Sequence, residues 1–143
     1  MLDKSIVGKC LENTNNRAYE LDDLVLMPEV TQYVRTLGAG AGSQKIYYVA
    51  RCFRNEMSTN ANRLREFTQI GVEWLGENEL DRCRDVRKDA LWLFKKLRGP
   101  DGWKLVDDAE RGLNIYVGDK AFEIVSDSGI QLLGGGPYVG GAG

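Results

Sequence analysis

The segment EFTQIGVEWLG (66–76) carries the side chains best suited to hold a small ligand. Its residues alternate with a period of two, which predicts a strand with two different faces. One face is expected to cover a core and comprises Thr68, Ile70, Val72 and Trp74. On the other face Gln69 and Glu73 flank Gly71, and at about 3.3 Å per residue their Cα atoms would lie roughly 13 Å apart. Their side chains can therefore grip the two ends of a ligand over the glycine, although a plain solvent face would show the same pattern.

Arginines and an aromatic ring accompany this strand. Arg54 and Glu56 end a segment rich in β-branched and aromatic residues, KIYYVARCFRNE (45–56), and Arg63 and Phe67 bracket the start of the next strand. An arginine fork donates two parallel hydrogen bonds to phosphate oxygens, and an aromatic face stacks on a base. Any one of these arginines alone is best explained as a solvated surface charge. The group as a whole suits a nucleotide.

The composition limits the chemistry that the chain performs by itself. It has 143 residues, with 19 basic and 21 acidic side chains, a net charge of −2 and no histidine. The absence of histidine excludes Ser-His triads and zinc sites built on imidazole. The overall charge gives no field that would hold a polyanion, so any nucleic-acid contact depends on a local patch such as the basic loop at 60–65.

Cysteine usage and the lack of long apolar runs favour a cytoplasmic protein. Cys10, Cys52 and Cys83 are odd in number and lack a CxxC spacing, which argues against a disulfide framework and a cysteine metal site. Residues 1–16 resemble neither a signal peptide nor a membrane anchor, and nowhere do roughly 18 apolar residues run together. We therefore expect a cytoplasmic location, no membrane partner and no metal held by protein side chains.

The pattern of elements predicts a single α+β domain over residues 1–143. Strands are expected from Leu24, at 45–56 and at 66–76, and then in a meander of GLNIYV (112–117), AFEIVS (121–126) and IQLL (130–133). Helices are expected from Pro28 to Gly38 and over 79–97, and loops over 1–22 and 98–109. The predicted fold is a mainly antiparallel β-sheet flanked by helices, in which 45–56 and 66–76 form a hairpin.

Several motifs now resemble one enzyme family. FRNE (53–56) and RLREFTQIGVE (63–73) are similar to motif 2 of the class II aminoacyl-tRNA synthetases. LMPEVTQYV (26–34) resembles the LRPEGT segment of histidyl-tRNA synthetases, ERGLNIYVGDKAFEI (110–124) their RGLDYYTGTVFE signature, and GGGPYVGG (134–141) their GGRYDGL segment. The glycyl enzymes share a similar motif 2, but the RGL-containing signature favours the histidyl branch. The resemblance implies a class II synthetase-like catalytic core without an anticodon-binding domain.

On the ATP side, the resemblance implies that Arg54 bridges the amino-acid carboxylate and the α-phosphate. Glu56 would face the adenine end, Arg63 would reach the outer phosphates, and Phe67 would stack on adenine. Arg111 would take the place of the family's second catalytic arginine and stabilise charge on the α-phosphate.

On the amino-acid side, the resemblance implies that Glu29, Thr31 and Gln69 hold the amino group, with Arg111 also in contact with the substrate. Glu73 and Tyr116 would bracket an imidazole, which makes histidine the expected amino acid. Gln69 and Glu73 are thus predicted as ligand-binding residues by two arguments, the pattern of the strand face and the family resemblance. Departures from the family pattern include Met27, Thr68 and Asn114, and Asn114 removes a charge beside the imidazole pocket.

The function implied by the resemblance is ATP- and Mg²⁺-dependent formation of an aminoacyl-adenylate for transfer to tRNA, as in a histidine-tRNA ligase. Such chemistry relies on positioning and electrostatics, so it needs no protein histidine. Histidine or another amino acid, ATP, tRNA and a second copy in a homodimer are the partners that the family would provide. Motif 1, which builds that dimer interface, would precede residue 1, and motif 3 would follow residue 143. A non-catalytic paralogue that binds an amino acid for regulation, or a pure interaction domain, is the alternative, and the chain is expected to be either a fragment or a reduced homologue.

Overall fold

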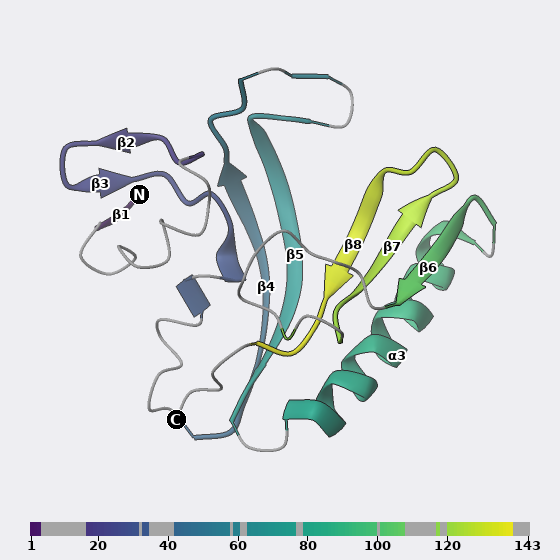
Figure 1. Cartoon of the computed structure of the whole chain (residues 1–143). Helices are drawn as coiled ribbons and strands as arrows, with labels where there is room; N and C mark the ends of the chain where they lie inside the picture. Colours follow the sequence, from purple (N-terminus) through teal and green to yellow (C-terminus); the bar gives the residue numbers. More distant parts are fainter. Residues whose placement is uncertain are drawn as a thin grey trace. The chain divides into compact units, whose positions relative to one another are not determined.

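The computed structural model (Figure 1) describes residues 1–3, 17–31, 33–34, 42–57, 59–60, 63–76, 79–99, 101–107, 117 and 120–138. The chain forms two compact units that divide between Gly76 and Glu77. Strands β1 to β5 belong to the first unit, and α3 with β6 to β8 belongs to the second. The strand pairings are antiparallel throughout, which confirms the α+β, mainly antiparallel prediction.

The first unit is dominated by the long hairpin of β4 (Gln44–Phe53) and β5 (Glu66–Leu75), drawn in teal in Figure 1. The two strands pair in one continuous register from Gln44 opposite Leu75 to Phe53 opposite Glu66. β-Branched and aromatic residues fill β4, as its strand propensity requires. The predicted hairpin is confirmed, with β4 ending before Arg54 rather than at Glu56.

A small sheet and a short helical turn complete this unit. β1 (Leu2–Asp3) and β2 (Glu20–Leu21) both pair with β3 (Leu24–Val25), so parts of the predicted N-terminal loop form strands. Residues 30, 31, 33 and 34 are helical, in agreement with the helix expected after Pro28. Val30 and Val34 of this turn pack on Cys52 and Leu75 of the hairpin and make a buried core.

The second unit has a helix and a three-stranded meander. α3 (Glu79–Arg98) precedes β6 (Trp103–Asp107), β7 (Phe122–Ser126) and β8 (Gln131–Gly135), in the order β6-β7-β8. The rings of Phe94 and Trp103 meet edge to face at 5.2 Å, and Arg87 forms an ion pair with Asp107, so α3 is attached to β6. The predicted helix over 79–97 is confirmed. Among the described residues, no helix combines the length and apolar character needed to cross a membrane.

Two further sequence predictions about the strands were wrong. The segment 98–109, expected as a loop, contains β6, and this strand pairs with β7 in the meander. The strand expected at 112–117 lies almost wholly outside the described residues. The apolar face of β5 was expected to cover a core, yet Ile70 on that face is 73% exposed and the opposite face packs on the helical turn. Alternation identifies two faces of a strand but carries no information about which one is covered.

Candidate functional site

The inner face of the β4–β5 hairpin brings the predicted polar residues together. The register places Tyr48 opposite Gly71, Ala50 opposite Gln69 and Ile46 opposite Glu73, with all six side chains or glycine positions on the same face. This face packs on the turn that starts at Pro28 through the core around Val30. Polar side chains from two strands and one turn therefore meet in a partly buried layer.

Glu73 is the most deeply buried acid in this layer, with 7% of its surface exposed. Its Oε1 accepts a hydrogen bond from the Thr31 hydroxyl at 3.0 Å and another from the Tyr48 hydroxyl at 3.2 Å. The two hydroxyl oxygens lie 3.5 Å from each other. Hydroxyl donors around one oxygen compensate part of the cost of burying a carboxylate and fix its orientation.

Gln69 connects the hairpin to the turn. Its Oε1 accepts the backbone N–H of Val30 at 2.9 Å and lies 3.5 Å from the Cys52 thiol, which donates to it. The N–H of Val30 belongs to the first residues of the helical turn, whose amides have no acceptor within the turn itself. The side-chain oxygen of Gln69 is thus used as a cap, and its NH₂ group is the part that can donate elsewhere.

Arg54 lies between the turn and an aromatic ring. Its Nε donates to the carbonyl oxygen of Pro28 at 3.1 Å, its Nη2 lies 3.4 Å from Glu29 Oε2, and its guanidinium carbon lies 4.8 Å from the centre of the Phe67 ring. The contact with the ring is a cation–π interaction. These contacts hold the guanidinium beside the residues that form the inner face.

Glu29 has one satisfied and one unsatisfied oxygen. Oε2 pairs with Arg54, whereas Oε1 is buried and has no hydrogen-bond partner among the described residues. Leaving such an oxygen without a donor costs about 1–3 kcal/mol or more for a charged group. An orphaned buried carboxylate oxygen at the edge of a polar layer is suited to receive a cationic group from a ligand.

Glu56 lies just beyond the end of β4 and is 6% exposed. Arg17 forms an ion pair with its Oε1 at 3.2 Å, and Arg65 donates to its backbone oxygen at 3.1 Å. The backbone N–H of Asn55 also donates to the Arg17 carbonyl at 2.7 Å. The segment around Arg17 therefore fixes the chain that leaves β4 and occupies one oxygen of Glu56.

Burial and two nearby charges of this layer affect the pKa of the Cys52 thiol. Burial raises the pKa of Cys52 above its ordinary value, the Arg54 charge opposes that rise, and Glu29 adds to it. Burial likewise raises the pKa of Cys83 on α3, against the opposing charges of Arg87 and Lys120. Both thiols are therefore held in the neutral form rather than activated as nucleophiles.

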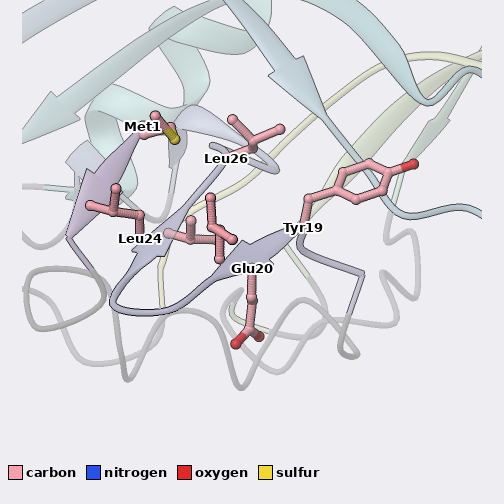
Figure 2. Close-up of a pocket in the computed structure, with 7 residues that line it drawn as sticks. Met1, Tyr19, Glu20, Leu24 and Leu26 are labelled. Atoms are coloured by element: carbon pink, nitrogen blue, oxygen red, sulfur yellow. The ribbon is translucent and has the colours of Figure 1, made fainter.

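A separate cavity lies at the N-terminal sheet (Figure 2). Its volume is ≈150 Å³, and its lining comprises Met1, Tyr19, Glu20, Leu21, Leu24, Val25 and Leu26. The labelled side chains of Met1, Leu24 and Leu26 are apolar, and the Glu20 carboxylate points away from them in this view. None of the residues predicted to bind a ligand lines this cavity, so the polar layer of the hairpin remains the candidate site.

Comparison with known proteins identifies the family of the chain that forms this layer. The family model described as tRNA synthetases class II (D, K and N) matches residues 11–99, which include the turn, the hairpin and α3. The chain belongs to the class II tRNA synthetases. This confirms the resemblance found in motif 2, and with it the prediction of a class II synthetase core.

Relatives of this synthetase chain differ in the amino acid they are named for. It is 32% identical over 110 residues to a histidine–tRNA ligase of Acaryochloris marina, covering 69% of the chain and 25% of the ligase. It is 28% identical over 131 residues to an aspartate–tRNA ligase of Bacteroides thetaiotaomicron, covering 80% of the chain and 22% of the ligase. The chain thus spans a quarter or less of the length of these curated relatives.

A solved structure has the same fold as the synthetase chain. It is the Desulfitobacterium hafniense PylSc, a pyrrolysyl tRNA synthetase, with a TM-score of 0.68 and 22% sequence identity. The match covers 93% of this chain and 46% of that one. At this level of identity the likeness supports the class II fold and carries no information about the substrate.

Most of the predicted site residues of the synthetase chain meet in the first unit. The residues brought into contact on or beside the inner face are Glu29, Thr31, Arg54, Phe67, Gln69 and Glu73. Glu56 lies beyond the strand with Arg17, and Arg63 is exposed in an isolated bridge with Asn60. Arg111 and Tyr116 lie outside the described residues.

The sequence analysis missed two residues that contact the predicted site residues, Tyr48 in the layer and Arg17 beside Glu56. Tyr48 faces Gly71, and a hairpin register counted outward from the turn would have identified this pair. Its ring fills the space above the glycine, where a ligand had been expected, so that detail of the prediction was wrong. Arg17 carries no comparable signal, because its contact with Glu56 joins positions 39 residues apart with no pattern in between.

Proposed function

We propose that this chain is the amino-acid-activating part of a class II synthetase and that histidine is its amino acid. The amino-acid carboxylate would attack the α-phosphate of ATP, forming the aminoacyl-adenylate as pyrophosphate leaves. The observation that supports the proposal is the inner hairpin face, where Arg54, Glu29, Thr31 and Glu73 lie in one connected layer. In the complete synthetase, the 3′-terminal hydroxyl of tRNA would then accept the aminoacyl group.

For the amino group, we assign the acceptor role to Glu29 and Thr31. The buried Oε1 of Glu29 has no hydrogen-bond partner among the described residues and can accept from an ammonium group. The Thr31 hydroxyl donates to Glu73 and keeps its own oxygen as an acceptor. Gln69 would support this subsite by capping the turn that carries both residues.

The buried acid favours histidine over aspartate. Glu73 accepts two hydroxyl hydrogen bonds on Oε1, an arrangement that stabilises its negative charge. A second carboxylate close to it would be repelled, whereas an imidazole N–H can donate to it. Tyr116 would complete this subsite, as the family resemblance implies.

On the ATP side, we assign the α-phosphate to Arg54, with Arg111 as the second arginine of the family pattern. Phe67 would stack on adenine with one ring face already covered by the Arg54 guanidinium, and Glu56 would face the adenine end. Arg63 is exposed and would reach the outer phosphates. Mg²⁺ would be held through the phosphate oxygens of ATP, whose charge it would neutralise.

The experiment that tests this proposal is ATP–pyrophosphate exchange by the purified chain with each of the twenty amino acids. Exchange that depends on histidine and disappears in Arg54→Ala would support a histidine-activating core. Exchange that depends on aspartate would keep the enzyme class and overturn the choice of amino acid. Binding of an amino acid without exchange would support the alternative of a non-catalytic paralogue, for which direct titration with histidine is the measurement.

A further inference from the structure

On the inner hairpin face, the side chain of Tyr48 packs directly over Gly71. These residues are direct partners in the β4–β5 register. A Cβ atom built on Gly71 would overlap the Cζ and hydroxyl of Tyr48, so no residue other than glycine leaves room for the ring. The ring therefore occupies the space between Gln69 and Glu73, two residues to either side of Gly71 along β5.

The hydroxyl of Tyr48 is also part of the acidic subsite. It donates to Glu73 Oε1 at 3.2 Å and lies 3.5 Å from the Thr31 hydroxyl. The ring and the hydroxyl thus act on the same place in different ways. The ring excludes volume, and the hydroxyl orients the carboxylate.

We propose that Tyr48 is a specificity-determining residue of the amino-acid site, an inference that rests on the function proposed above. Its ring closes the subsite above Gly71 and so limits the size of the side chain that reaches Glu73. Its hydroxyl holds the carboxylate in the orientation that accepts a proton donor from the substrate side chain. The expected substrate is therefore histidine, whose imidazole carries an N–H donor and is smaller than the indole of tryptophan.

The physical basis is the cost of misfit in a packed pocket. One methylene too many or too few changes discrimination by about 10–200-fold. The phenol group of Tyr48 is much larger than a methylene, so its removal should lower the discrimination against larger side chains at least tenfold. Removing only the hydroxyl should leave the size limit in place and weaken the contact between Glu73 and the substrate.

The test uses the full chain and calorimetric titration with histidine, phenylalanine and tryptophan. In Tyr48→Leu, which keeps an apolar side chain but removes the end of the ring above Gly71, the ratio of histidine affinity to tryptophan affinity should fall at least tenfold. Tyr48→Phe should keep that ratio and bind histidine about tenfold more weakly. The matched controls are Tyr47→Leu and Tyr47→Phe, because Tyr47 is the adjacent tyrosine, lies on the opposite face and is 84% exposed.

The outcomes separate this inference from the proposed function. If the wild-type chain binds histidine and both Tyr48 variants keep the wild-type affinity and preference, Tyr48 has only a structural role and the inference fails alone. A uniform loss of affinity for all three amino acids in Tyr48→Leu, with a lowered Tm, would overturn it in the same way. If the wild-type chain binds none of the twenty amino acids, the proposed function fails and this inference fails with it. If Tyr48→Leu does not fold, Tyr48→Phe decides, and an unchanged histidine affinity would overturn the inference.

Discussion

The two faces of the β4–β5 hairpin differ in what they bury: the inner face buries polar side chains, and the outer face exposes apolar ones. The inner face carries Gln69 and the buried Glu73, while the outer face carries Val49 and Ile70, which are 70% and 73% exposed. In most two-faced antiparallel sheets the apolar face is the covered one. Here the turn after Pro28 covers a face that combines core residues such as Cys52 and Leu75 with the polar Gln69 and Glu73.

The difference shows that burial on this hairpin is not explained by hydrophobicity alone. A buried carboxylate destabilises a fold unless donors compensate it, and the inner face provides two hydroxyls for Glu73 and a guanidinium for Glu29. Even so, one oxygen of Glu29 remains without a donor among the described residues. The ligand site that we propose in this layer would account for such a cost, because folds depart from maximal stability at functional sites.

The largest expected effect separates two arginines on the two faces. Arg54→Ala should lower pyrophosphate exchange at least about 100-fold, because loss of one preorganised charged donor typically costs that much. Arg51, three residues earlier, forms an exposed ion pair with Glu66 and serves as the matched control. We expect Arg51→Ala to retain exchange and to change the free energy of unfolding by less than about 1 kcal/mol. Equal exchange rates in the two variants would remove the functional distinction between the faces.

A second comparison concerns two acids on β5. Glu73→Gln should weaken histidine binding by roughly 10–100-fold while leaving ATP binding unchanged, since a hydrogen bond to a charged group contributes about 1.5–3 kcal/mol. Glu66→Gln at the exposed start of the strand is the control and should change neither affinity. Titration with histidine and with ATP provides both numbers. A loss of ATP affinity equal to the loss of histidine affinity would contradict the assignment of Glu73 to the amino acid.

The third prediction tests the packing of the inner face. Gly71→Ala forces a methyl group against the Tyr48 ring and should lower the free energy of unfolding by about 1–3 kcal/mol. Gly42→Ala, at a glycine with no atom near the added Cβ, is the control and should be nearly neutral. Thermal or urea unfolding measures both. If Gly71→Ala is as stable as wild type, the ring does not occupy this space in solution, and the inference about Tyr48 loses its basis.

Local patterns were sufficient to predict the elements that make up the site. Period-two alternation gave the strand 66–76, and the apolar stripe with Gly99 at its end gave the helix, both confirmed within one or two residues. The prediction that Gln69 and Glu73 share one face of this strand, with Arg54 close to the end of the neighbouring strand, agrees with the structure. These predictions succeeded because each depends on residues close together in the sequence.

The predictions that failed depend on contacts between distant residues. The covered face of β5 is decided by the turn at 28–34, which lies more than thirty residues away, and no local property of the strand contains that information. The strand β6 was missed because WKLVD is short and follows Gly99 and Gly102, both typical of loops. Its pairing with β7 stabilises a strand that propensity alone leaves undecided.

The smallest expected effect tests the outer face directly. Ile70→Ser replaces an exposed apolar side chain, so the free energy of unfolding should change by less than about 0.5 kcal/mol and histidine binding should not change. The inner-face control is Cys52→Ser, which places a hydroxyl in the fully buried core next to Val30 and should cost about 1–3 kcal/mol. Urea unfolding of both variants measures the contrast. A loss of 2 kcal/mol or more in Ile70→Ser would mean that the outer face is covered in solution, because only a buried side chain contributes that much. The contrast between a covered inner face and an exposed outer face would then be wrong for the protein in solution. The functional role of the inner face would then depend on the Arg54 and Glu73 variants alone.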